Sequence, residues 1–147
     1  MSVSIPLETI KEIAQELDMG MKCFYHIPTG ALESYPDELK GHAGFDEELW
    51  QESIDKVEEN YGEYIPFEGM ESHESFRIME KFVEEIADER ARQRFHDAIA
   101  YKHPFQNFKQ LLLHYPELRE QWFLYKDQCY IEFVKDQIDV YNQSVKG

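Results

Sequence analysis

The sequence predicts an α+β protein that is predominantly helical, with about six helices packed with a small two- or three-stranded antiparallel sheet near the N-terminus. Three observations predict this class. Apolar residues recur at helical spacing through most of the chain, β-forming residues flank a Pro-Thr-Gly turn, and a proline or a capping residue stands where several helical patterns begin. A length of 147 residues suits one hydrophobic core, so we expect a single domain over residues 1–147.

The N-terminal part predicts one helix followed by a hairpin. The helix is expected to start at Ser4-Ile5-Pro6 and to stop at Gly20, and its apolar stripe is Leu7, Ile10, Ile13, Ala14 and Leu17. Residues 21–27 and 31–35 are rich in β-forming side chains and flank Pro28-Thr29-Gly30, which is typical of a hairpin turn.

The next segment predicts a loop, a helix and a short extended piece. Residues 36–44 are polar, which indicates a surface loop, and Asp46 is placed to cap the following helix. The apolar stripe of that helix is Leu49, Trp50, Ile54, Val57 and Tyr61. Because Tyr64–Phe67 contains Pro66, it is expected to be an edge strand or an extended link.

From Ser72 onward the pattern is almost entirely helical. Asp88 is a candidate N-cap, and Pro104 and Pro116 each suit the first turn of a helix, the last of which is expected to reach about Asn142. The four apolar stripes are Phe76, Met79, Phe82, Val83 and Ile86; Ala91, Phe95, Ala98 and Ile99; Phe105, Phe108, Leu111, Leu112 and Tyr115; and Leu118, Trp122, Tyr125, Cys129 and Phe133. Trp50 and Trp122 stand on such stripes, so both indoles are expected in the core.

The formal charge of −15 is unevenly distributed. Residues 1–89 contain 23 acidic and 6 basic side chains, whereas residues 90–147 contain 7 and 9. The acidic first part would repel nucleic acid and anionic lipid, so an anionic partner would have to approach the later part.

A basic stretch in the later part is a candidate anion site with a competing interpretation. The candidate residues are Arg90, Arg92, Arg94, Lys102, His103 and Lys109, near the expected helix start at Pro104. Alternatively, the arginines pair with the preceding Glu84, Glu85, Asp88 and Glu89, and Phe95, Phe105 and Phe108 pack in the core. The second interpretation is the one we favour.

Other kinds of site lack their sequence patterns. No two histidines are spaced as HxH or HxxxH, so we expect no metal, and no Gly-x-Ser-x-Gly or GxxxxGKS motif indicates a hydrolase or a nucleotide cofactor. Cys23 and Cys129 lie far apart without CxxC spacing, and no uncharged apolar run reaches the roughly 18 residues of a membrane span. These features favour the cytoplasm, with no membrane association and no cofactor.

Five features of the sequence together suggest a family: the N-terminal amphipathic helix, the aromatic strand leading into Thr29-Gly30, Arg94–Ile99, Pro104-Phe105 with Phe108-Lys109, and the aromatic pair Trp122-Phe123. In these features the chain resembles an uncharacterised bacterial protein family of unknown function. The resemblance covers most of the chain. It implies a small cytoplasmic α+β protein and carries over no activity or catalytic residue.

Taken together, these features lead us to expect a non-enzymatic cytoplasmic protein-interaction or binding module with an acidic surface. The expected partner is another protein with a basic surface, attracted by the acidic segments 47–63 and 68–89, and self-association is left open. The alternative is a small enzyme or nucleic-acid-associated factor that binds an anionic ligand through residues 90–109.

Overall fold

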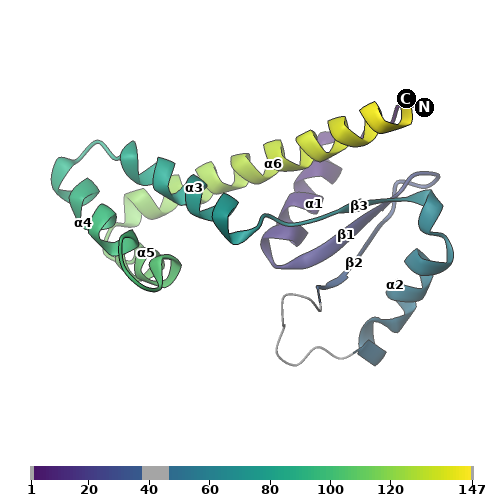
Figure 1. The fold of residues 1–147 in the computed structure, drawn as a ribbon, viewed down its shortest axis with the longest axis horizontal. Coiled ribbons are helices and arrows are strands. Elements are labelled where there is room, and N and C mark those ends of the chain that lie inside the picture. The colour runs from purple at the N-terminus through teal and green to yellow at the C-terminus, as the bar shows by residue number, and fades with distance from the viewer. Residues whose placement is uncertain (1, 38–46, 147) are drawn as a thin grey trace. The chain divides into compact units, whose positions relative to one another are not determined.

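The computed structural model describes residues 2–37 and 47–146 (Figure 1). Within these ranges the chain forms six α-helices and one three-stranded antiparallel sheet, which confirms the predicted fold class. The chain divides into two compact units, the first formed by Met1–Gly69 and Tyr130–Gly147 and the second by Met70–Cys129. The single domain over residues 1–147 stays a prediction.

The sheet of the first unit has the order β2-β1-β3. Strand β1 (Met21–His26) pairs antiparallel with β2 (Leu32–Pro36) on one side and with β3 (Tyr64–Phe67) on the other. The turn between β1 and β2 contains Gly30 at a φ of 77°, a conformation that glycine adopts without steric cost. The predicted hairpin and the edge strand that contains Pro66 are both confirmed.

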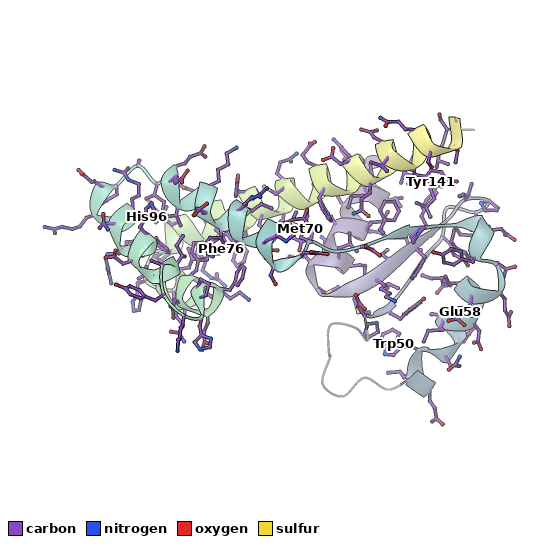
Figure 2. The ribbon with its side chains drawn as sticks, viewed as in Figure 1. Trp50, Glu58, Met70, Phe76, His96 and Tyr141 are labelled. Carbon is purple, nitrogen blue, oxygen red and sulfur yellow. The ribbon has the colours of Figure 1, made fainter. Side chains whose placement is uncertain are left out.

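Helices cover both faces of this sheet. Successive side chains of β1 point to opposite sides, so apolar residues of β1 pack against helices on each face. Cys23 and Tyr25 pack with α1 (Leu7–Asp18) and with the part of α6 (Pro116–Lys146) that belongs to the first unit, including Val134. Tyr141, which Figure 2 labels on α6, packs against the same cluster. On the other face Phe24 packs with residues of α2 (Glu47–Glu59).

Three expected core positions in the first unit are wrong. Leu7 is 51% exposed, Leu49 is 72% exposed, and Tyr61 is 57% exposed. Leu7 and Leu49 stand in the first turn of their helices, where few neighbours can cover a side chain. Tyr61 lies in the 3₁₀ turn η2 (Tyr61–Glu63), where the α-helical period no longer applies. Trp50 is partly buried rather than in the core (Figure 2).

Two further predictions lie mostly outside the described residues. The cap at Asp46 falls within residues 38–46, as does most of the loop expected over 36–44, whereas Pro36 ends β2.

The second unit is built from α3 (Ser72–Glu84), α4 (Glu89–Ile99), α5 (Pro104–Leu112) and the first part of α6. Its core contains Trp122, as predicted, together with Met79, Phe82, Val83, Ile86, Ala91, Phe95, Ile99, Phe108 and Leu112. Helices α5 and α6 begin at Pro104 and Pro116 as predicted, and α6 extends to Lys146, beyond the expected end at Asn142. None of the helices in the described part of the chain has the length and apolar character needed to cross a bilayer.

Candidate functional site

The basic stretch predicted as an anion site lies on α4, on α5 and on the turn between them. Helix α4 begins at Asp88, whose carboxylate accepts a hydrogen bond from the N–H of Ala91 at 3.0 Å, as predicted for an N-cap. Its buried face contains Ala91, Phe95 and Ile99, and of the charged residues between them Arg94 and Asp97 are exposed whereas Arg92 is partly buried.

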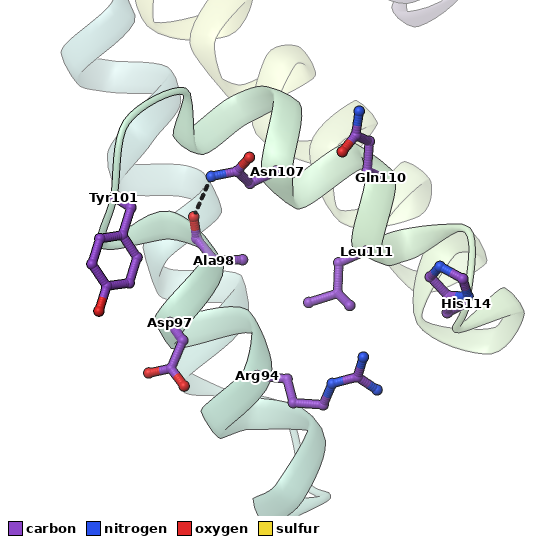
Figure 3. Close-up of a pocket in the computed structure, with 8 residues that line it drawn as sticks. All are labelled: Arg94, Asp97, Ala98, Tyr101, Asn107, Gln110, Leu111 and His114. Carbon is purple, nitrogen blue, oxygen red and sulfur yellow. Dashed lines mark hydrogen bonds between the residues drawn. The ribbon is translucent and has the colours of Figure 1, made fainter.

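The turn between α4 and α5 is held by Asn107. The Asn107 side chain donates to the carbonyl of Ala98 at 3.0 Å (Figure 3) and to that of Lys102 at 2.9 Å, so it satisfies one acceptor in the last turn of α4 and one just after it. His103 has a left-handed backbone at a φ of 59° and directly precedes Pro104, the first residue of α5. The side chain at position 107 therefore has a structural role in the turn.

A shallow groove of about 550 Å³ runs between α4 and α5, and Figure 3 shows the residues that line it. They are Arg94, Asp97, Ala98, Tyr101, Asn107, Gln110, Leu111 and His114. Arg94 is the one candidate anion-site residue among them, and the lining also includes the carboxylate of Asp97. A second groove, of about 530 Å³, has Asp88 and Glu117 in its lining and none of the six candidate residues. Neither groove is lined by a continuous positive surface.

Two of the candidate arginines are engaged by the protein itself. Arg92 is partly buried and donates from Nη1 to the carbonyl of Ile86 at 2.8 Å. Arg94 donates from Nη1 to the Tyr115 hydroxyl at 2.6 Å, and its guanidinium lies 5.5 Å from the centre of the same ring. Each bond uses one of the five N–H donors of its guanidinium, so these contacts fix the positions of the two side chains and leave fewer donors for a ligand.

The other four candidate residues, Arg90, Lys102, His103 and Lys109, are exposed and line neither groove. The structure thus does not gather the six side chains into one site. The competing interpretation also needs a correction, because no salt bridge within residues 2–37 and 47–146 joins Arg90, Arg92 or Arg94 to the preceding carboxylates. A carbonyl and a phenol hold Arg92 and Arg94 instead.

The aromatic residues of the stretch are used for packing. Phe95 is fully buried and Phe108 is 1% exposed, with their rings 5.5 Å apart in an edge-to-face arrangement. Phe105 is 36% exposed, and its ring forms an edge-to-face pair with that of Phe76, with the ring centres 6.3 Å apart. The prediction that these side chains pack in the core is confirmed for Phe95 and Phe108, whereas Phe105 lies at the margin.

The cysteines do not form a reactive site. Burial raises the pKa of the Cys23 thiol to about 12, and the nearby carboxylate of Glu16 adds to this effect. Burial also raises the pKa of Cys129. Since the thiolate is the nucleophilic form, neither cysteine is activated at neutral pH. Across the described ranges no group of three metal-ligating side chains comes together, and His42 lies outside those ranges.

A second candidate surface is the outer side of α2. We define the α2 acidic face as Glu48, Glu52, Asp55 and Glu59, which are all exposed and follow one another at helical spacing of four, three and four residues. The buried residues Ile54 and Val57 face the sheet on the other side of the helix. Lys56 is the single basic residue of α2, and its ammonium group contacts Glu33 at 3.4 Å and Glu52 at 3.8 Å.

Repulsion within the α2 acidic face opposes the helix, and the contact of Glu52 with Lys56, also four residues apart, offsets part of it. Like charges four residues apart, as in Glu48 with Glu52 and Asp55 with Glu59, destabilise a helix by about 0.2–0.5 kcal/mol per pair. The charge of the whole unit adds to this repulsion, because the first unit contains 19 acidic and 6 basic side chains and the second contains 11 and 9. The first unit therefore carries most of the negative charge of the protein.

The fold and these two surfaces define a small α+β protein whose helices and sheet present an acidic face and a groove of mixed charge. The chain belongs to the UPF0158 family, an uncharacterised protein family whose model matches residues 7–143, and this confirms the resemblance noted in the sequence. The chain is similar to a UPF0158 protein of Pseudomonas aeruginosa, with 26% identity over 87 residues that cover 58% of this chain and 57% of that protein. The match thus spans little more than half the length of that relative. No solved structure matches.

Proposed function

We propose that this protein is a non-enzymatic, cytoplasmic protein-interaction module whose α2 acidic face attracts a basic surface of another protein. The observation that carries the proposal is the placement of four exposed carboxylates on the side of α2 that faces away from its buried residues. Four carboxylates that repel one another and point to solvent are well suited to an oppositely charged partner, which would reduce the repulsion on binding. Both cysteines are free thiols, in keeping with a reducing compartment.

The alternative function, an anionic ligand bound through residues 90–109, has less support. Arg92 and Arg94 already bond to a carbonyl and a hydroxyl group of the protein, and Asp97 is among the residues that line the groove with Arg94. An anion would therefore meet one engaged guanidinium and a nearby carboxylate.

The proposal is tested with a flexible, fluorescent lysine-rich peptide and anisotropy measured at low and at physiological ionic strength. We expect binding that weakens with salt, because the contact is between exposed charges. Replacing Glu52 and Glu59 by Gln should weaken it several-fold. The matched control, Glu117→Gln with Glu120→Gln, makes the same change in net charge at two exposed positions of the second unit and should have a small effect. Equal losses in the two variants would contradict a specific role of α2.

The same assay with labelled single- and double-stranded DNA and RNA tests the alternative. We expect no binding at low ionic strength. Salt-sensitive binding that disappears in the variant Lys102→Glu with Lys109→Glu, two exposed positions, would favour the anion-binding function instead.

A further inference from the structure

The two outer edges of the sheet differ in which peptide groups are available. The N–H of His26 donates to the carbonyl of Ala31 at 2.8 Å, toward β2, and the N–H of Ile27 donates to the carbonyl of Glu63 at 2.9 Å, toward β3. Peptide groups alternate in direction along a strand, so the pairing register fixes which residues of β2 and β3 direct their N–H and C=O groups away from β1. We call these the outward groups. They belong to Leu32, Ser34 and Pro36 on β2, and to Tyr64, Pro66 and the following Glu68 on the β3 side.

The β3 edge is closed to a further strand. Pro66 occupies the middle outward position and has no N–H to donate. At the next outward position the side chain of Gln137, on α6, accepts from the N–H of Glu68 at 3.1 Å and donates to the carbonyl of Glu68 at 3.0 Å. Both groups of Glu68 that could pair with an incoming strand are therefore occupied.

The β2 edge is different. Within residues 2–37 and 47–146 no hydrogen bond reaches the outward N–H and C=O groups of Leu32 and Ser34. These groups and the carbonyl of Pro36 could pair with a strand of about four residues. An edge with unpaired groups is a template for strand addition unless charge or shape prevents it, so the chemistry around β2 decides what can bind there.

Carboxylates lie on both sides of the β2 edge. On the α1 side, Glu16 accepts a hydrogen bond from the Ser34 hydroxyl at 3.2 Å. On the α2 side, Glu33 contacts Lys56 at 3.4 Å, and Lys56 also contacts Glu52, whose side chain is 87% exposed. A strand added at this edge would project its side chains alternately toward these two sets of carboxylates.

We propose that the β2 edge binds an extended segment of another protein that carries Lys or Arg, which adds to the sheet as a fourth strand. The sign of the partner's charge rests on the proposed function, whereas the location at β2 rests on the contrast between the two edges. Main-chain hydrogen bonds supply the pairing, and the carboxylates on either side select basic side chains. Pairing of two copies of β2 is disfavoured because it would bring Glu33 and Glu16 of both chains close together.

The test uses a capped peptide of about eight residues that alternates Lys and Val, followed by backbone amide exchange in NMR. In the free protein the outward amides of Leu32 and Ser34 should exchange fast, while the paired amides of Glu33 and Tyr35 are protected. The peptide should slow exchange at Leu32 and Ser34. The same peptide with N-methylated backbone amides keeps its charges but cannot pair, and it should lose at least about tenfold in affinity.

A pair of variants at one position provides the matched control. Ser34→Pro removes the outward N–H, as Pro66 does in β3, and should weaken binding about tenfold, whereas Ser34→Ala removes the bond to Glu16 but keeps the N–H and should bind nearly as the wild type does. Circular dichroism checks whether both variants fold. If Ser34→Pro does not fold, the comparison of the two peptides decides the question.

Three results would overturn the β2 inference. The first is equal affinity for the methylated and unmethylated peptides, and the second is no binding of the lysine–valine peptide. In either case, if the flexible lysine-rich peptide still binds the α2 acidic face, the proposed function survives. The third is protection of Leu32 and Ser34 in the free protein that disappears on dilution, which would show that a second copy of the chain occupies the edge.

Discussion

Replacing Phe108 by Ala should destabilise the second unit strongly. Phe108 is 1% exposed, and its ring centre lies 4.9 Å from that of Trp122, 5.5 Å from that of Phe95 and 6.2 Å from that of Phe82. Truncating a buried Phe typically costs about 3–5 kcal/mol, and each well-oriented aromatic pair adds about 0.5–1.5 kcal/mol beyond the buried area. With three such neighbours we expect a cost near the upper end, about 4–5 kcal/mol.

Phe105→Ala on the same helix is the matched control. Phe105 is 36% exposed and has one aromatic neighbour, Phe76, at 6.3 Å. The chemical change is identical, but less apolar area is lost and Ala is the better helix former, so the expected cost is about 1 kcal/mol. The difference of about 3–4 kcal/mol therefore reports burial at position 108.

The measurement is urea unfolding followed by tryptophan emission in a Trp50→Phe background, so that the signal comes from Trp122. This indole contacts the Phe108 ring and belongs to the second unit. The slope of the unfolding free energy against urea also shows whether a variant alters the surface exposed on unfolding. If the two variants lose stability equally, to within about 0.5 kcal/mol, the assignment of Phe108 to the centre of this core is refuted.

Three further outcomes are expected. Asp88→Ala should cost about 1 kcal/mol because it removes the acceptor for the Ala91 N–H, and Asp88→Asn should restore most of that loss in the same urea assay. Gln137→Ala should accelerate amide exchange at Glu68, since it removes two hydrogen bonds to that residue, and unchanged exchange would mean that the bonds do not form in solution. The free energy of unfolding should fall as the pH rises from about 9 to about 12. The unfolded chain loses the Cys23 proton near its ordinary pKa of 9.0, whereas burial keeps the thiol protonated in the folded state up to a pKa of about 12. Urea midpoints that stay constant over this range would contradict the burial of Cys23.

The local elements of this protein are determined by short-range sequence features. Asp88 caps α4, Pro104 starts α5, and Gly30 takes the positive φ of the hairpin turn, because each of these effects depends on a residue and its nearest neighbours. The buried faces also follow from helical spacing, and the errors at Leu7, Leu49 and Tyr61 fall at helix ends, where periodicity says least about burial.

The candidate anion site could not be judged from the sequence. The composition of residues 90–109 indicates a cluster of basic residues, but whether a basic side chain can bind a ligand depends on the contacts that it already makes within the protein. The acceptors of Arg92 and Arg94 are the carbonyl of Ile86 and the hydroxyl of Tyr115, the second of which lies 21 positions away in the chain. Charge counting by segment cannot reveal such partners, and it also suggested ion pairs that the described residues do not form.

The contrast between the two sheet edges depends on contacts that the tertiary structure decided. The sequence predicted an edge strand or an extended link over Tyr64–Phe67 through Pro66, because a proline lacks the N–H that a central strand needs. It did not show that Gln137 would occupy both peptide groups of Glu68, since these residues are 69 positions apart and meet only when α6 packs beside the sheet. The same packing and strand order leave the outward groups of β2 without such a partner among the described residues. Whether the peptide groups at a sheet edge find hydrogen-bond partners depends on elements that are distant in sequence, so short-range patterns cannot specify it.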